Sequence, residues 1–225
     1  MMIRRLLIPI YLLLISSNLK SQKTVDLSLH NLKAVNTIMD LEIREGEKVV
    51  RAVKDSAVKE FDEPTFVRIN SINFSNGIIE VKVLSRLLAD APDFARGFIG
   101  IAFRINDTNS KFESIYLRPL NATVEDQTRR NRSIQYFSYP DFKYQRLRQE
   151  FCGKYESYAD IALNEWIQIR IEVKGKKAKL YINDAKKPSF IINDLKLGEN
   201  QKGAIGLFVD IGTEGFFKDI KITSQ

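Results

Sequence analysis

The sequence predicts an all-β protein in which two antiparallel sheets pack as a sandwich. Apolar residues recur at every second position in many short segments, which is typical of strands with one face in a core. No segment keeps the 3.6-residue period of an amphipathic helix over three turns. Of the 225 residues, 44% are hydrophobic and 28% are charged. This is an ordinary globular balance that can supply a sizeable core.

The first 22 residues predict a secretory signal peptide. Arg4 and Arg5 precede an apolar stretch from Leu6 to Ile15, and polar and small residues follow it. A spanning helix needs roughly 20 apolar residues, so this stretch is too short. We expect residues 1–22 to be removed and residues 23–225 to form a single domain. The mature protein should then be exported, to the periplasm or the medium, without a membrane span.

Strands are expected in order along the rest of the chain. The early candidates are TVDLSLHN, IMDLEIRE, EKVVRAV, TFVRI and GIIEVKVL. GFIGIAFRI and KFESIYLR flank the turn signal NDTNS and predict a hairpin. WIQIRIEVKG and AKLYIND predict a second hairpin, with one apolar and one polar face. GAIGLFVD and FFKDIKIT supply two more strands near the C-terminus.

One long segment, Arg118 to Tyr158, interrupts the alternation and predicts an ordered insertion. It contains Pro119 and Pro140 and is far longer than a hairpin loop. Long insertions in compact domains are usually functional or disordered, and the many tyrosines and phenylalanines of this one favour packing over disorder. Thr123 with Asp126 could form a capping box for a single helical turn.

Several of these strings resemble a known superfamily. NEWIQIRIEVKGKKAKLYIND is similar to the central hairpin of the concanavalin A-like lectin and glucanase sandwiches, which include the laminin G-like group. GAIGLFVDIGTEGFFKDIKIT resembles their closing strands, and FSNGIIEVKV, GFIGIAFRI and IYLRP resemble earlier ones. Within this superfamily, the chain resembles the secreted bacterial 3-keto-disaccharide hydrolase-like domains. The resemblance covers roughly residues 60–225.

This resemblance implies a jelly roll of two curved sheets that binds ligands on its concave face or loop rim. Members include lectins, carbohydrate-binding modules, glycosidases and proteins without an assigned activity. Glucanases of this fold carry E-x-D-x-x-E on one strand, and this chain lacks it. The nearest string places Asp40, Glu42 and Glu45 in a different order, and we interpret these as exposed carboxylates.

The insertion supplies what a sugar site needs, namely planar hydrogen-bonding groups beside aromatic rings. The candidate ligand-binding residues are Tyr116, Arg118, Asn121, Gln127, Arg130, Asn131, Gln135, Tyr136, Tyr144, Arg146, Arg148 and Tyr155. Arginine presents a fork that suits carboxylates, so an acidic or oxidised sugar is among the expected ligands. The alternative is structural: the same arginines could bond to nearby acids and hold the insertion in place.

Within this hypothesis the residues have different roles. Arg118, Arg130 and Arg148 would anchor the ligand. Asp126, Asn131 and Gln135 would bond ring hydroxyls, and Tyr136 or Tyr144 would stack. Tyr116 and Arg118 share a strand face opposite Ile115 and Leu117, which should point them towards a concave site.

Two other classes of function stay open. A glycoside hydrolase or a 3-keto-glycoside hydrolase or lyase would use Asp126 or Glu156 as acid or base. An adhesion module that binds protein would instead show an exposed apolar patch on the convex face.

Composition limits the classes of partner and cofactor that the protein is expected to bind. Loss of Arg4, Arg5 and Lys20 with the signal lowers the formal charge from +7 to +4, too small an excess to imply nucleic acid. A lone histidine, His30, makes a serine triad or a histidine metal site improbable. No cofactor is implied, although an all-oxygen calcium site stays open. Cys152 is the only cysteine and is expected to be half-buried and inert.

Overall fold

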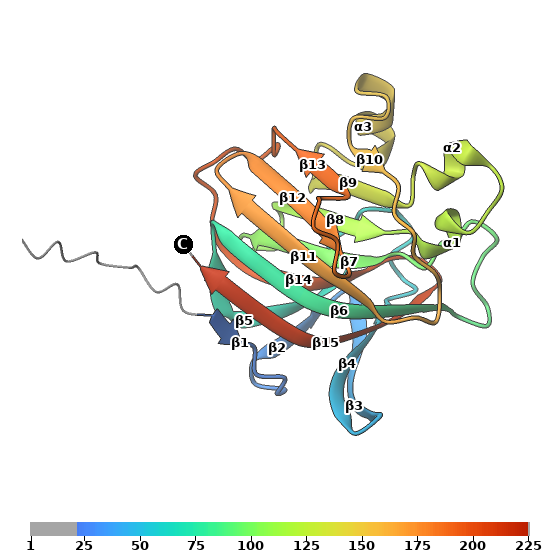
Figure 1. Cartoon of the computed structure of the whole chain (residues 1–225). Helices are drawn as coiled ribbons and strands as arrows, with labels where there is room; N and C mark the ends of the chain where they lie inside the picture. The colour runs from blue at the N-terminus through green and yellow to red at the C-terminus, as the bar shows by residue number, and fades with distance from the viewer. Residues whose placement is uncertain (1–21, 225) are drawn as a thin grey trace, which may run out of the picture.

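The computed structural model describes residues 22–224 and contains two antiparallel sheets and three short helices (Figure 1). The strands of sheet A are β1 (Gln22–Thr24), β3 (Thr37–Arg44), β4 (Glu47–Lys54), β6 (Gly77–Leu87), β11 (Ile167–Lys174), β12 (Lys177–Ile182), β13 (Phe190–Ile192) and β15 (Thr213–Ser224). The strands of sheet B are β2 (Leu32–Val35), β5 (Phe66–Phe74), β7 (Ile99–Ile105), β8 (Phe112–Leu117), β9 (Ile134–Tyr139), β10 (Glu156–Ser157) and β14 (Gly203–Val209). The helices are α1 (Pro119–Ala122), α2 (Gln127–Arg130) and α3 (Tyr144–Glu150).

The sheets form a sandwich, which confirms the predicted fold class. Sheet A has the order β13-β12-β11-β6-β15-β4-β3 with β1 beside β15, and sheet B has the order β10-β9-β8-β7-β14-β5-β2. Both predicted hairpins form, as β7–β8 and β11–β12. The predicted signal peptide lies outside the described residues except for Gln22, which begins β1, so its cleavage stays a prediction.

One predicted strand is wrong. TVDLSLHN contributes only Thr24 to a strand, because local polar contacts hold the rest in a turn. The backbone N–H of Asn31 donates to the Ser28 carbonyl at 3.0 Å, and the Asn31 side chain bonds the Asp26 carbonyl at 2.8 Å. Asn, Asp and Ser side chains often compete with regular ladders in this way.

Gly215 of β15 shows which face of sheet B points into the sandwich. A Cβ there would lie 2.5 Å from Val209 Cγ1 and 3.1 Å from Ile99 Cδ1, so the sheets approach closely at this position. Ile99 and Ile101 therefore face sheet A, as the alternation predicted. Because side chains alternate along a strand, Tyr116 and the residues in register with it face away from sheet A.

The outer face of sheet B is covered by an aromatic layer. Phe66, Phe112, Tyr116, Phe137 and Phe208 are each 0–1% exposed, and neighbouring rings in this group contact one another with centroids 5.3–5.8 Å apart. Loops from other parts of the chain must cover this face, because an uncovered sheet face would leave the rings in water.

The long insertion is ordered, but part of it belongs to the sheet. β9 pairs with β8, and β10 pairs with β9 at the edge of sheet B. In Figure 1, α1 and α2 lie together at one end of the sandwich, and α3 stands at the edge near β10. Asp126 caps α2 itself: its Oδ1 accepts from Thr128 N at 2.8 Å and Arg129 N at 3.3 Å. The predicted box of Thr123 with Asp126 is thus replaced by a single aspartate cap.

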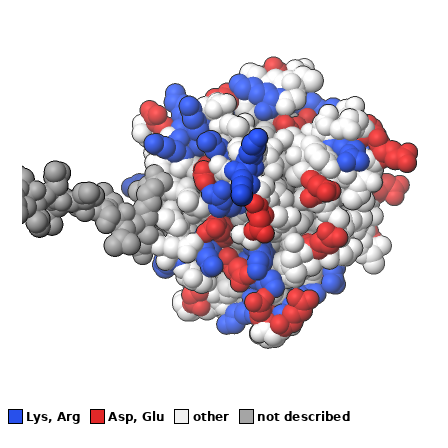
Figure 2. All heavy atoms as spheres, viewed as in Figure 1, with Lys and Arg blue, Asp and Glu red and all other residues white. Residues whose placement is uncertain are grey.

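The outer face of sheet A carries a small apolar cluster under charged side chains. Trp166 packs on Val49, Leu84 and Phe216, and Lys218 Nζ lies 4.4 Å from the centre of the Trp166 ring. Acidic and basic side chains are interspersed over the face seen in Figure 2. This face therefore shows no field of a single sign.

Arg104 is a buried charge that connects four segments. It is 1% exposed, and its guanidinium donates to the carbonyls of Ser75, Gly175 and Gly198 at 2.9–3.0 Å and to Asn76 Oδ1 at 3.3 Å. Burial lowers the pKa of the guanidinium. A charge in this position is stable only while its donors are satisfied.

We expect Arg104→Met to lower the free energy of unfolding by about 3 kcal/mol or more, because it leaves several buried carbonyls without a donor. Urea unfolding followed by circular dichroism measures this. Arg170→Met is the control, since Arg170 is 31% exposed and pairs with Glu172, and it should cost less than about 1 kcal/mol. Equal losses in the two variants would contradict the structural role of Arg104.

Candidate functional site

A cavity of about 320 Å³ opens beside the aromatic layer of sheet B. It is lined by Phe61, Phe94, Arg96, Phe98, Arg118, Asn121, Arg129, Arg132, Tyr144 and Arg148. Five of these residues are arginines and four are aromatic, and none is an aspartate or glutamate. Such a lining combines strong positive charge with flat apolar surface.

The cavity is built from connections rather than from strand faces. Its lining residues come from the β4–β5 connection (Phe61), the β6–β7 connection (Phe94, Arg96, Phe98), the end of β8 with α1 (Arg118, Asn121), α2 with the turn after it (Arg129, Arg132) and α3 (Tyr144, Arg148). Tyr144 and Arg148 are four residues apart on α3, so they share one side of the helix.

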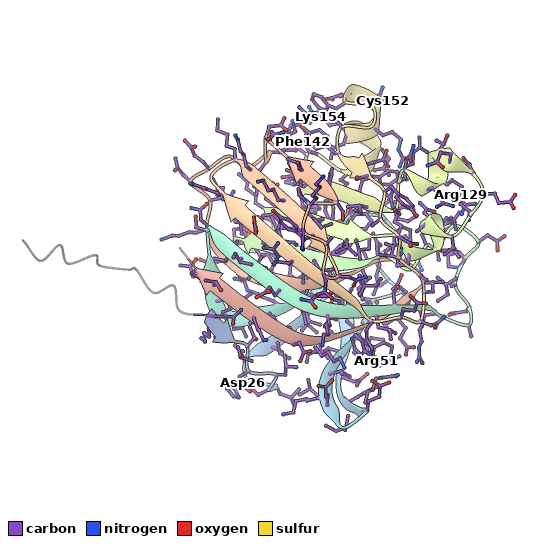
Figure 3. The ribbon with its side chains drawn as sticks, viewed as in Figure 1. Asp26, Arg51, Arg129, Phe142, Cys152 and Lys154 are labelled. Carbon is purple, nitrogen blue, oxygen red and sulfur yellow. The ribbon has the colours of Figure 1, made fainter. Side chains whose placement is uncertain are left out.

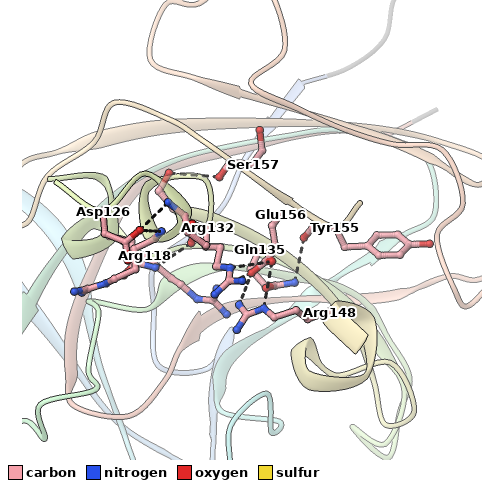
Figure 4. A network of polar contacts seen from close by, with 12 residues as sticks. Arg118, Asp126, Arg132, Gln135, Arg148, Tyr155, Glu156 and Ser157 are labelled. Carbon is pink, nitrogen blue, oxygen red and sulfur yellow. Dashed lines mark hydrogen bonds and ion pairs between the residues drawn. The ribbon is translucent and has the colours of Figure 1, made fainter. Parts of the chain in front are cut away.

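Glu156 on β10 is the acid at the base of this cluster (Figure 4). Its side chain is 6% exposed and pairs with three arginines: Arg118 at 3.3 Å, Arg132 at 3.5 Å and Arg148, whose Nε lies 3.3 Å from Oε2. One carboxylate therefore joins the end of β8, the turn before β9 and α3. For Glu156, the structure therefore agrees with the alternative stated above, in which the arginines bond to a nearby acid and hold the insertion in place.

The remaining arginines leave the cavity with excess positive charge. Burial and the nearby charges of Arg129 and Arg118 lower the pKa of Arg96. Arg129, marked in Figure 3 on α2, makes no ion pair with any residue in the range 22–224. The Arg96 Nη1 group donates only to backbone carbonyls, of Asp93 and Ala95. Cations gathered in this way attract an anion.

Asn121 adds an unsatisfied group to the wall. It is 6% exposed, and its Nδ2 donates to the Arg132 carbonyl at 3.2 Å. Its Oδ1 is buried and has no hydrogen-bond partner within residues 22–224. Because a buried orphan acceptor costs about 1–3 kcal/mol, this oxygen lowers the stability of the cavity wall.

A buried polar chain lies beneath the cavity. Arg118 Nη2 donates to the Tyr116 hydroxyl at 2.7 Å. Burial lowers the pKa of Arg118. Tyr116, Asp62 and Glu156 together raise the pKa by more, so it lies above the ordinary value of arginine. Asp62 is fully buried and accepts from Tyr144 N at 2.7 Å. The first residue of α3 is thus held by a carboxylate.

Asp62 is the most perturbed acid near the site. Burial raises its pKa to about 7, and the neighbouring Asp210 adds to the effect. Asp62 N donates to Asp210 Oδ2 at 3.0 Å, and Lys54 Nζ donates to Asp210 Oδ1 at 2.5 Å. Asp62 Oδ1 has no partner among the described residues. The sequence analysis did not single out Asp62, because local sequence does not show that the folded chain buries it, nor that Asp210, 148 positions away, lies beside it.

Four of the predicted ligand-binding residues line the cavity, namely Arg118, Asn121, Tyr144 and Arg148. Tyr144 is half-buried, and its ring meets that of Phe61 edge-on with centroids 5.8 Å apart. Of the two tyrosines expected to stack on a sugar, it is therefore the one placed to do so.

Tyr136 and Gln135 do not lie where the predicted ligand contacts require them. Tyr136 is 0% exposed, because its ring faces the inside of the sandwich and its hydroxyl donates to Glu113 Oε2 at 2.5 Å. Gln135 is 1% exposed, and its amide donates to the carbonyls of Tyr136 and Tyr155. Neither side chain reaches the cavity, so the stacking and hydroxyl-binding roles predicted for them are not available.

Tyr116 and Tyr155 are also buried. Tyr116 faces outward from sheet B as predicted, but it is 1% exposed because Phe98 and Arg118 cover it. Tyr155 is 2% exposed and donates to Asp194 Oδ2 at 2.6 Å. Both support the core instead of meeting a ligand.

The remaining predicted residues are accessible but lie outside the lining. Arg130 donates to the Tyr158 hydroxyl at 2.9 Å, and Arg146 pairs with Glu150 at 2.7 Å along α3. Gln127 and Asn131 bond each other at 2.7 Å. Asp126 is occupied as the cap of α2.

Three cavity arginines were missed by the sequence analysis: Arg96, Arg129 and Arg132. The spacing of Arg129 and Arg132 could have indicated a shared side of one helical turn. No sequence signal places Arg96 beside them, since it lies before β7 in a different connection. The aromatic residues Phe61, Phe94 and Phe98 were missed for the same reason.

Other sequence expectations have mixed outcomes. Cys152 is exposed rather than half-buried (Figure 3). Across residues 22–224, no group of three or more His, Cys, Asp or Glu could hold a metal ion. The described helices include none with the length and apolar character needed to cross a membrane.

Comparison with known proteins identifies the family. Residues 44–223 match the model of the 3-keto-alpha-glucoside-1,2-lyase-like domain. The chain belongs to this family. Among curated protein sequences none matches the chain.

Solved structures share the fold of this family member at low sequence identity. The carbohydrate-binding module CBM66 from Bacillus subtilis is 15% identical, with a TM-score of 0.58 over 86% of this chain and 96% of that one. A candidate glycosyl hydrolase from Parabacteroides distasonis is 17% identical, with a TM-score of 0.56 over 91% and 100%. A galectin-like protein of unknown function from Bacillus subtilis is 10% identical, with a TM-score of 0.52 over 87% and 90%.

The raised pKa of Asp62 gives a prediction for stability against pH. A carboxyl whose pKa is higher in the folded state contributes stability at low pH that is lost as pH rises. We expect the stability of the wild type relative to Asp62→Asn to fall by up to about 4 kcal/mol between pH 4 and pH 7, and then to level off. Asparagine suits this position because Asp62 has a φ of 55°.

Chemical denaturation at half-unit pH steps measures this difference. Groups shared by the two proteins, such as the buried Glu113, cancel in the comparison. If the stability of the wild type relative to Asp62→Asn stayed constant across this pH range, or rose with pH, the raised pKa of Asp62 would be refuted.

Proposed function

We propose that this protein is an exported carbohydrate-binding β-sandwich whose arginine-lined cavity binds an acidic sugar. The observation that carries the proposal is the imbalance in the cavity: five lining arginines, and a single acid, Glu156, pairing with three of them. Export rests on the predicted signal peptide.

The lining offers both kinds of contact that a sugar uses. Arginine forks bind carboxylates through two parallel hydrogen bonds, and Arg96 and Arg129 keep donors that no carboxylate among the described residues occupies. The rings of Tyr144 and Phe94 provide apolar surface for the faces of a pyranose ring.

Binding is favoured over hydrolysis by the absence of acids from the lining. A glycosidase generally places two carboxyl groups on either side of the scissile bond. Asp126 caps α2 and does not line the cavity, and Glu156 lies against three guanidinium groups.

Adjacent arginines on α2 provide the test. Arg129 lines the cavity, whereas Arg130 contacts Tyr158 outside it. We expect Arg129→Gln to weaken binding of a uronic acid or other acidic glycan about tenfold or more, because a hydrogen bond to a charged group is lost. Arg130→Gln should leave the affinity unchanged.

A glycan array with neutral, carboxylated and sulfated members selects the ligand, and calorimetry measures both variants. Affinity should also fall as salt rises from 50 to 500 mM, since screening weakens charge pairing. Preference for neutral glycans, or equal losses in the two variants, would contradict the proposal.

A second candidate is the reaction that the family description names, elimination from a 3-keto-α-glucoside. The family match favours it. A base would remove the proton at C2, next to the ketone; the electron pair would form the enolate, the bond from C1 to the leaving oxygen would break, and that oxygen would take up a proton. The arginines could stabilise the enolate charge.

Incubation with a 3-keto-α-glucoside tests this candidate. Chromatography measures release of the leaving group. If the cavity catalyses the reaction, release should be abolished in Arg118→Met and retained in Arg130→Gln. No release by the wild type would leave binding as the function. The adhesion alternative has less support, because only Ile38 and Ile43, on β3, share a strand among the large apolar residues exposed in the described part of the chain.

A further inference from the structure

A second cavity adjoins the arginine cavity and shares one residue with it. It has a volume of about 430 Å³, and its lining includes Lys54, Asp55, Val58, Lys59, Asp90 and Phe94. Phe94 lines both cavities. Two sites that meet at one aromatic side chain can hold consecutive units of one ligand.

Phe94 is exposed but held in place. It is 50% exposed, an unusual position for a phenylalanine. Its ring meets the Phe61 ring edge-on, with centroids 5.5 Å apart and planes at 65°. Because Phe61 is itself packed on Phe98 and Tyr144, the exposed ring has a fixed orientation at the boundary between the cavities.

The charge of the second cavity differs from that of the first. Its lining holds the acids Asp55 and Asp90 and the lysines Lys54 and Lys59. Because Lys54 is already paired with Asp210, two acids and one lysine remain and the lining is slightly acidic. Leu88, Val58, Pro92 and Ile211 supply apolar surface. A slightly acidic lining with apolar groups disfavours an anion and suits a neutral sugar, whereas the arginine cavity suits an anionic one.

The floors of the two cavities are joined by hydrogen bonds. Asp210 accepts from Lys54 Nζ at 2.5 Å and Ile211 N at 2.8 Å on the side of the second cavity. It also accepts from Asp62 N at 3.0 Å, and Asp62 accepts from Tyr144 N in the arginine cavity. This buried chain fixes the position of one cavity relative to the other.

We infer that the protein binds an oligosaccharide across both cavities, with an acidic residue among the arginines, Phe94 against a sugar ring and a neutral residue in the second cavity. This inference rests on the proposed function and specifies its ligand class. It predicts that a chain of mixed charge binds more tightly than its acidic monosaccharide.

The test is calorimetry with glucuronate and with oligosaccharides that carry one terminal glucuronate and one or two neutral xylose units. We expect the affinity of the wild type to rise about tenfold from the monosaccharide to the trisaccharide, because the longer chain also contacts Phe94 and occupies the second cavity. Val58→Asp, which alters only the second cavity, should remove this gain and leave glucuronate binding unchanged. Asp90→Ala, at an exposed residue of the same cavity, provides a second variant with little risk to folding.

The outcomes separate the two proposals. Binding that does not grow tighter from glucuronate to the longer chains, or a gain that survives either variant, overturns the extended site and leaves the acidic-sugar site standing. Failure of every probe to bind the wild type overturns both. A gain that both variants reduce confirms the second cavity as part of the site.

Discussion

The pairing of one carboxylate with three arginines holds the candidate site together. Glu156 lies on the short edge strand β10, and its partners come from the end of β8, the turn before β9 and the helix α3. Without that carboxylate, three guanidinium groups would repel one another in a half-buried space. The walls of the cavity therefore depend on an acid that is itself almost hidden from solvent.

The site also illustrates a conflict between stability and ligand binding. Arg96 and Arg129 add positive charge that Glu156 does not neutralise, and Asn121 keeps a buried oxygen without a partner. Such features lower stability and are expected where a protein prepares for a ligand. By contrast, the buried Arg104 has acceptors for its donors and serves the fold.

The sequence predicted the sandwich well because alternation encodes which face of a strand is buried. Ile99, Ile101 and the apolar face of β11 are buried as expected. It predicted the site less well, because composition does not say which face of sheet B is covered. Tyr136 looked suitable for stacking but belongs to an inner strand face, while Arg96 and Phe94 enter the site from a connection about 50 residues before α3 in the chain. Contacts of that kind depend on loop paths that local patterns do not encode.

The placement of the cavity on connections has a consequence for how this family can diversify. The aromatic layer of sheet B lies beneath the cavity and is covered at Tyr116 by Phe98 and Arg118, whereas the exposed Phe94 contacts Phe61 instead. Exchange of Arg129 or Phe94 would change which ligand the cavity recognises, and the strands below would keep their packing. One scaffold could in this way carry a lectin-like pocket in one member and a reactive one in another, with each specificity evolving independently of the fold.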